Sequence, residues 1–459
     1  MPPAVQQVAA DSALQARDSA RALNLAQLAA SAESKDFRRQ MWLGWMYWRA
    51  GEFEKAKAAF VRSRELAADN PDTWVALVLF LANNNQMDAA RAEVDAAEKK
   101  LQGPTATLAL ANCNAMIGRV DRANTLFREA LAAKPDDPVV LRSAAEFCVR
   151  TGRLPEAQVH LRKLLAVSRA SSPETFAMAR RMLAYLLSTE GDPEKAREAL
   201  ALFGPEGDSV GLSASDALQD RRTRAQLLAL RNTRDSHREA VQILEDLLTK
   251  NQGTADDCFL AAQLHESLGD WAKSRRRLQQ LINQFPDSNA GQWAAAARSF
   301  LRHKELGEAA AALGKLKEQQ PDAALTREIQ ARLLHAEGRK SDAVALVKEM
   351  AQAPDADLAA LGFLLSEFDD QAGAEALLRR FVAQSKQPDS VLILVRYLIS
   401  QKRLTEALDL CDRAWGTASD LAVADACLLA LGQMDPVAPV FQRVVSQMQA
   451  ALAKNPGRV

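Results

Sequence analysis

The chain has 459 residues, of which 48% are hydrophobic and 25% are charged. These proportions are typical of a globular protein and exclude a largely disordered chain. The 58 Lys and Arg residues balance the 58 Asp and Glu residues, so no net charge attracts nucleic acid or an anionic membrane. With 20 Gly and 17 Pro, the chain has too few turn residues for a β fold of this length, which predicts an all-α protein.

The N-terminal residues lack a basic segment followed by an apolar one, so we predict no secretory signal within them. The five cysteines lie far apart without a C-x-x-C pair, which favours small buried side chains over a zinc site or disulfides. Every apolar run is shorter than the roughly 18 residues that span a bilayer, so no membrane span is expected. We therefore expect a cytoplasmic protein, or a periplasmic one if an upstream signal is missing.

Residues 1–35 are rich in Ala and Leu and predict an N-terminal helical cap. Directly after them, Trp42, Trp45, Tyr47 and Trp48 lie within seven positions. If exposed, such a cluster would be a hot spot for a partner. The alternative is that the cap folds over it, and the sequence leaves both interpretations open.

From residue 36 onward, a small residue followed four positions later by a larger one recurs at intervals of about 34 residues. The small positions are Ala56, Ala90, Ala123, Ala157, Ala196, Ala240, Ser274, Ala309, Ala343, Ala374 and Ala407. In most units a Gly or Asn, such as Gly51 or Asn85, lies five residues earlier. These residues tolerate the left-handed conformation that ends a helix, so each unit is predicted to be helix, tight turn, helix.

This pattern resembles the tetratricopeptide repeat family, whose motif is W-x-x-L-G-x-x-Y, then A-x-x-x-F, then P. The first unit matches it at Leu43, Gly44, Tyr47, Ala56 and Phe60. The resemblance implies an all-α, right-handed superhelical α-solenoid of about 11–12 antiparallel helix pairs.

The segment 204–216 contains Gly and Ser without helical periodicity and is predicted to be a loop or hinge. It separates an N-terminal array, residues 36–203, from a C-terminal array, residues 217–459. One continuous superhelix with a long loop is equally consistent with the sequence. A twelfth unit is predicted at the C-terminal end, with Gly432 as its turn and Val437 and Phe441 as its packing pair.

Motifs for catalysis were not found: the chain has no H-E-x-x-H, no G-x-S-x-G and no nucleotide-binding P-loop. We therefore predict that the protein is not an enzyme and has no catalytic, cofactor-binding or metal-binding residues. The arginines between Arg221 and Arg238 are interleaved with acidic residues and lack aromatic neighbours, so nucleic-acid binding is not expected either.

The resemblance implies that the position eleven residues before each small residue faces a concave groove that binds peptides. Along the chain this position changes from aromatic and aliphatic residues to arginines. The predicted partner-binding residues are Trp45, Trp48, Tyr185, Arg298, Arg302, Arg332 and Arg396. Arginine forks bind carboxylates, which predicts an acidic or C-terminal peptide as ligand. In the alternative interpretation, the same arginines pair with Glu266, Glu328 and Glu367 within the groove.

Taken together, these features predict a non-catalytic scaffold that binds a protein or peptide partner in the groove of the superhelix. Two other interpretations stay open. In the first, the chain is the regulatory repeat portion of a larger enzyme. In the second, it is a bacterial envelope or secretion assembly factor. Self-association through the open ends of the solenoid is a further possibility.

Overall fold

The computed structural model describes residues 3–16, 18–29, 34–169, 171–204, 211–433 and 439–454. Over these residues the chain forms 26 α-helices and one short 3₁₀ helix, and it contains no β-strand. The predicted all-α fold is therefore confirmed. The chain divides into two units, residues 1–243 and residues 244–459, and the boundary falls within one helix, Arg234–Thr249.

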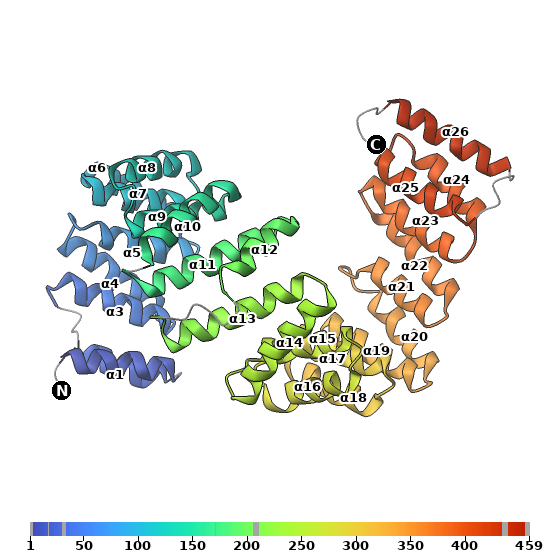
Figure 1. Ribbon diagram of the computed structural model, residues 1–459, viewed down its shortest axis with the longest axis horizontal. Coiled ribbons are helices and arrows are strands. Elements are labelled where there is room, and N and C mark those ends of the chain that lie inside the picture. The colour runs from blue at the N-terminus through green and yellow to red at the C-terminus, as the bar shows by residue number, and fades with distance from the viewer. Residues whose placement is uncertain are drawn as a thin grey trace. The chain divides into compact units, whose positions relative to one another are not determined.

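The helices of the first unit, together with α14, which contains the boundary, follow one another along the chain (Figure 1). Their bounds are α1 (Pro3–Gln15), α2 (Ser19–Ala29), α3 (Phe37–Arg49), α4 (Phe53–Leu66), α5 (Pro71–Asn83), α6 (Met87–Lys100), α7 (Pro104–Met116), α8 (Val120–Ala133), α9 (Pro138–Arg150), α10 (Leu154–Ser168), α11 (Pro173–Ser188), α12 (Pro193–Ala201), α13 (Ala214–Leu230) and α14 (Arg234–Thr249).

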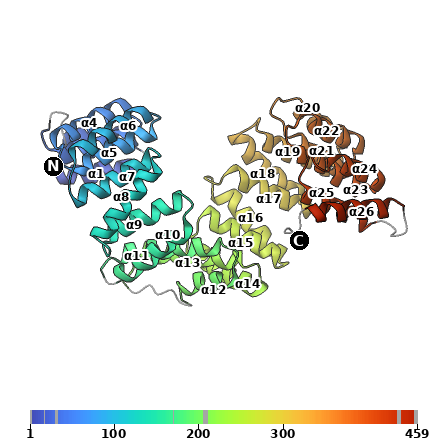
Figure 2. The ribbon, with the colours of Figure 1, turned by 90° about the horizontal axis from the view of Figure 1, so that it is seen from above.

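The second unit continues in the same way (Figure 2). Its helices are α15 (Ala255–Ser267), α16 (Trp271–Gln284), α17 (Ala290–Arg302), α18 (Leu306–Gln319), α19 (Ala324–Ala336), α20 (Lys340–Met350), α21 (Leu358–Glu367), α22 (Gln371–Gln384), η1 (Pro388–Ser390), α23 (Val391–Ser400), α24 (Leu404–Ala414), α25 (Asp420–Leu431) and α26 (Pro439–Lys454).

With the exception of α13, each odd-numbered helix packs against the even-numbered helix that follows it, and we call these the first and second helices of a pair. Within the described residues, α3 to α26 follow one another as twelve successive pairs, and α1 and α2 form one more before them. Several first helices begin with a capping side chain followed by Pro, as at Asn70–Pro71 and Asp137–Pro138. The predicted solenoid of about 11–12 helix pairs is therefore confirmed.

The small residues of the repeat lie where the two helices of a pair meet. All of them are fully buried except Ala196, which is only half-buried. In that pair Ala199 is fully buried instead. Helix α12, which carries both alanines, has only nine residues. Gly191, five residues before Ala196, has a φ of 72°, so the register of the repeat is kept in this pair.

Most turns between paired helices contain one residue with a positive φ angle. Gly51 and Asn85 adopt it, at 81° and 59°, as predicted. Lys304, Asp369 and Lys402 adopt the same conformation at 59°, 56° and 59°, although neither Gly nor Asn marks these turns in the sequence. At the first of them the N–H of Glu305 donates to the carbonyl of Phe300 at 2.9 Å, which is the bond of a Schellman motif. The geometry of the hairpin therefore imposes this conformation on a lysine as well.

The predicted loop at 204–216 lies partly outside the described residues, which omit 205–210. On its C-terminal side, α13 already begins at Ala214, after the capping side chain of Ser213. The predicted turn residue of the last unit, Gly432, ends α25 with a φ of −61°. Val437 lies outside the described residues, and Phe441 packs against the core of α20 to α26.

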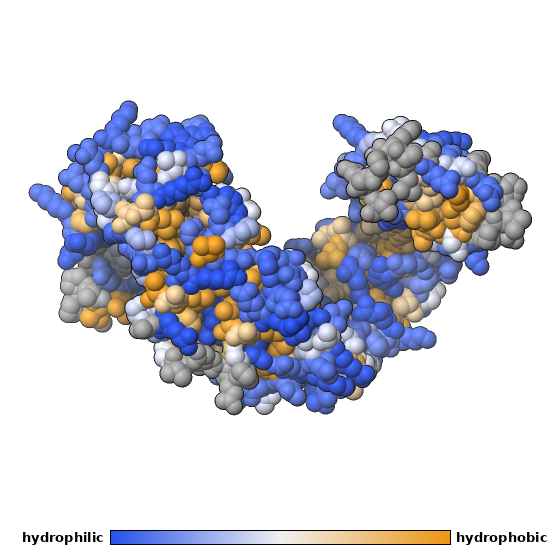
Figure 3. Space-filling view, turned by 45° about the horizontal axis from the view of Figure 1, so that its top comes forward, coloured by the Kyte–Doolittle hydropathy of each residue, from blue (hydrophilic) through white to orange (hydrophobic). Residues whose placement is uncertain are grey.

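Apolar and hydrophilic residues share the surface of the chain. On the face seen in Figure 3, hydrophilic residues predominate, and apolar residues form patches between them. All five cysteines are buried and free of disulfides, as predicted. Within the described ranges, no helix is both long enough and apolar enough to cross a bilayer.

Candidate functional site

The first helices α15, α17, α19 and α21 of the second unit carry a row of charged residues. These residues are Glu266, Arg298, Arg302, Glu328, Arg332 and Glu367, and we call the surface that they form the charged face. Three of the predicted partner-binding arginines are thus brought together on adjacent helices.

Ion pairs connect the charged face from helix to helix. Arg302 of α17 donates to Glu266 of α15 at 2.9 Å. Arg298 donates twice to Glu328 of α19, at 3.3 and 2.6 Å. Glu266, Glu328 and Glu367 are the glutamates with which the arginines were predicted to pair in the alternative interpretation of the sequence.

Arg332 has two acidic partners. Its Nε donates to Glu328 at 2.8 Å, and both of its terminal nitrogens donate to Glu367 of α21. Burial by itself would raise the pKa of Glu328, but hydrogen bonds from Arg298 and Arg332 outweigh it and lower that pKa. The ion pairs of Arg298 and Arg332 therefore connect α17 to α19 and α19 to α21.

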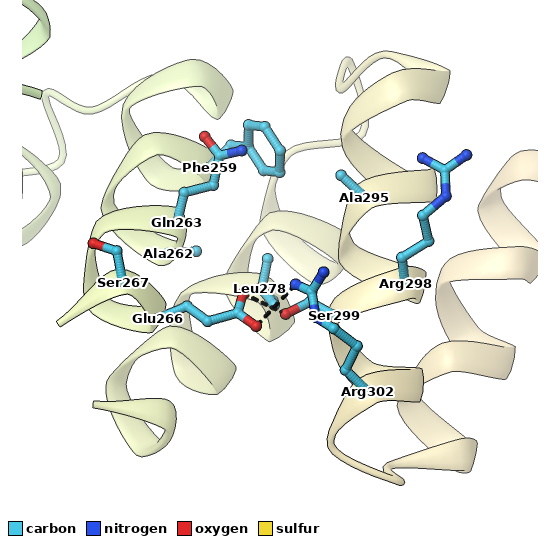
Figure 4. A pocket seen from close by; sticks show the side chains of 10 residues that line it. All are labelled: Phe259, Ala262, Gln263, Glu266, Ser267, Leu278, Ala295, Arg298, Ser299 and Arg302. Carbon is cyan, nitrogen blue, oxygen red and sulfur yellow. Dashed lines mark hydrogen bonds and ion pairs between the residues drawn. The ribbon is translucent and has the colours of Figure 1, made fainter. Parts of the chain in front are cut away.

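Two hollows lie on the charged face. The first has a volume of about 550 Å³ and lies between α15 and α17. Its apolar lining consists of Phe259, Ala262, Leu278 and Ala295. Figure 4 shows Arg302 reaching toward Glu266 at one end of this hollow, whereas Arg298 points away from Glu266.

The second hollow has a volume of about 490 Å³ and lies beyond α17, against α19 and α21. Leu301, Ala336 and Phe368 supply its apolar lining, and the ring of His335 stacks on Phe368 with centroids 4.5 Å apart. Arg298 and Arg302 line both hollows. These two arginines therefore border two spaces, each large enough for a side chain.

The predicted Arg396 lies on α23 and does not join these ion pairs. Its side chain is exposed, and among the described residues no hydrogen bond or ion pair to it is found. Tyr185 belongs to the first unit and is 65% exposed on α11.

The predicted residues Trp45 and Trp48 are half-buried in an aromatic cluster of the first unit. Their rings stack with centroids 5.3 Å apart, and Trp45 meets Phe60 edge to face at 5.3 Å. Trp48 meets Phe80 in the same way at 5.4 Å. The two tryptophans therefore contribute to the packing of α3, α4 and α5, and only part of each ring is available to a partner.

The N-terminal helix pair covers a different side of α3. Four alanines of α1 and α2, namely Ala10, Ala13, Ala22 and Ala26, form a buried cluster with Met46. Trp42 packs against this cluster as well. Helices α1 and α2 thus bury Met46 and part of Trp42, whereas Trp45 and Trp48 pack mainly on Phe60 and Phe80.

The apolar residues that line the hollows were not predicted from the sequence. Phe259 lies four residues before the groove position Gln263, and Ala295 lies three residues before Arg298. Residues three and four apart share one face of a helix. Extending each groove position by three or four residues along its helix would therefore have predicted these lining residues. Within the residues that the structure describes, no cluster of His, Cys, Asp or Glu could hold a metal ion.

Comparison with protein families identifies the repeat. Models described as tetratricopeptide repeats match residues 8–71, 75–138, 117–174 and 259–288. The chain is therefore a tetratricopeptide repeat protein, a class that serves as protein-interaction scaffolds. The match at 8–71 begins within α1, so the N-terminal helix pair is included in the family pattern.

Several solved structures match the chain at low sequence identity. The crystal structure of yeast Tom70 is 12% identical, with a TM-score of 0.38, and the match covers 97% of this chain and 99% of that chain. The Cut9–Hcn1 hetero-tetramer of APC/C gives 15% identity and a TM-score of 0.41, covering 100% and 95%. PilF of Pseudomonas aeruginosa gives 16% identity and a TM-score of 0.31, covering 64% and 96%. No curated protein matches the chain.

Proposed function

We propose that the protein is a non-catalytic scaffold that binds an extended peptide segment of a partner protein across the charged face of its second unit. The observation that supports this proposal is the pair of hollows that share Arg298 and Arg302. Peptide sites combine apolar spaces that hold side chains with a few polar groups that fix the backbone or a charge. The charged face offers both within reach of one short segment.

The small residues in the hollows support the same proposal. Ala295 of α17 is half-buried in the first hollow, and Ala336 of α19 is exposed in the second. Neither alanine belongs to the buried core, so a larger side chain there would fill the hollow without overpacking the helices. The two positions therefore allow binding to be tested separately from folding.

The test is a selection of random twelve-residue peptides, displayed on phage, on the intact chain. We expect peptides that bind the natural chain and that lose affinity for the double variant Ala295→Leu/Ala336→Leu. The matched control is Ala310→Leu, an exposed position on the second helix α18 that lines neither hollow. Equal affinity of the selected peptides for the natural chain and the double variant would place the binding site elsewhere.

A further inference from the structure

The three arginines of the charged face differ in how many of their donors are already used. A guanidinium group has five N–H donors. Arg332 donates three hydrogen bonds to two glutamates, and Arg298 donates two to Glu328. Arg302 donates a single one, to Glu266, and its side chain is 64% exposed, compared with 38% for Arg298 and 27% for Arg332. Arg302 therefore retains the most donors for a ligand.

Glu266, the ion-pair partner of Arg302, also interacts with other hydrogen-bonding groups. Glu266 also accepts a hydrogen bond from the hydroxyl of Ser299 at 2.6 Å, and Nε2 of His303 lies 3.3 Å from its carboxylate. Ser299 is buried, so its bond to Glu266 is protected from water. If Arg302 turned toward a ligand, Glu266 would keep two hydrogen-bonding groups. Withdrawing Arg298 or Arg332 from Glu328 would instead break a connection between helices.

The position of Arg302 beside both hollows limits the spacing of the side chains in the ligand. Packed helices lie about 8–10 Å apart, and an extended chain advances about 3.3 Å per residue. A peptide that crosses α17 at right angles therefore spans the distance between the hollows in about three residues. Its apolar side chains would enter the hollows, and a residue between them would pass over Arg302.

We propose that Arg302 binds the carboxylate of a partner peptide in which an Asp or Glu lies between two apolar residues about three positions apart. This inference rests on the proposed function, because it names the ligand of the same face. The donors left on Arg302 make it complementary to a carboxylate, whereas Arg298 and Arg332 hold the helices in place.

The experiment uses the same phage selection, carried out on the natural chain and on the variant Arg302→Gln. Arg276→Gln is the control, because Arg276 is exposed on the second helix α16 and lines neither hollow. We expect acidic residues between two apolar ones to be enriched on the natural chain and on the control, and to lose this enrichment on Arg302→Gln. Circular dichroism of each variant confirms that the helices are intact.

A double-mutant cycle then tests the contact directly. A selected peptide is synthesised with its acidic residue and with the corresponding amide, and each form is titrated against the natural chain and Arg302→Gln. Losing one charge-assisted hydrogen bond predicts about tenfold weaker binding for either single change. When both partners are changed, we expect little further loss.

The outcomes separate this inference from the proposed function. Peptides that bind the charged face without an acidic residue, or that bind Arg302→Gln unchanged, would overturn the role of Arg302 and leave peptide binding intact. If no peptide is enriched above the bare support, the proposed function fails and this inference fails with it.

Discussion

The guanidinium of Arg180 and the carboxylate of Asp220 form an ion pair in which both side chains are almost completely buried. Arg180 is 2% exposed and Asp220 is 5% exposed, and the pair connects α11 to α13 across the predicted loop. The rings of Phe176 and Phe203 lie 5.1 and 5.3 Å from the guanidinium carbon of Arg180. A charged pair therefore lies in the buried space between α11 and α13.

Removing one member of this pair should destabilise the first unit strongly. We expect Asp220→Asn to lower the free energy of unfolding by about 3–5 kcal/mol, because it leaves a buried guanidinium without its charge partner. The double variant Arg180→Met/Asp220→Leu should recover most of this loss, since apolar side chains suit the two phenylalanine rings. Urea unfolding followed by circular dichroism measures both. A double variant no more stable than Asp220→Asn would contradict this interpretation.

Gly44 is required by the close approach of α3 to α4. A Cβ atom on Gly44 would lie 2.8 Å from the ring carbons Cδ1 and Cε1 of Phe60, which is itself fully buried. We expect Gly44→Ala to cost about 1–3 kcal/mol through overpacking. Gly314→Ala on α18 is the control, because its Cβ would meet no atom within 4 Å. The control should gain up to about 1 kcal/mol from helix propensity, and a loss of similar size in both variants would refute the packing argument.

The turn residue Lys304 is a place where stability can be increased. Its φ of 59° costs a residue with a side chain about 1–2 kcal/mol, a cost that glycine does not incur. After the greater flexibility of an unfolded glycine is subtracted, we expect Lys304→Gly to stabilise the chain by up to about 1 kcal/mol. Lys317→Gly, within α18, should destabilise it by about the same amount. Thermal unfolding of both variants compares them, and an unchanged or lower midpoint for Lys304→Gly would contradict the prediction.

Glu245 should make the second unit sensitive to acid. A hydrogen bond from His265, followed by hydrogen bonds and charge from Arg277, lowers the pKa of Glu245 from 4.5 to about 2. The folded state thus holds the carboxylate ionised more strongly than the unfolded state does. The resulting stabilisation is fully present above pH about 4.5 and is lost as the pH falls toward about 2.

The variant Glu245→Gln isolates this effect. At pH 6 we expect its urea midpoint to lie below that of the natural chain, and the difference should shrink as the pH approaches 3. Glu318→Gln, an exposed carboxylate on α18, serves as the control for general acid effects. A difference that is constant from pH 6 to pH 3 would show that the charge of Glu245 is not responsible.

The arrangement of helix pairs could be predicted from the sequence because it depends on local spacing. A fully buried small residue such as Ala56 or Ala309 recurs in most pairs, and a residue with a positive φ follows the first helix of most pairs. Both signals are contained within one repeat of about 34 residues. Where a pair departs from the common length, as in the short α12, the small residue Ala196 is only half-buried.

The sequence by itself determined that this chain is a tetratricopeptide repeat solenoid and that Arg298, Arg302 and Arg332 lie on its first helices. Only the tertiary structure decided how many hydrogen-bond donors of each arginine are used by glutamates of neighbouring helices. Glu266, Glu328 and Glu367 lie about 30 or more residues from the arginines that reach them across helices. Whether a guanidinium is occupied depends on distances between side chains of different repeats, and these distances are fixed by the packing of one helix pair on the next.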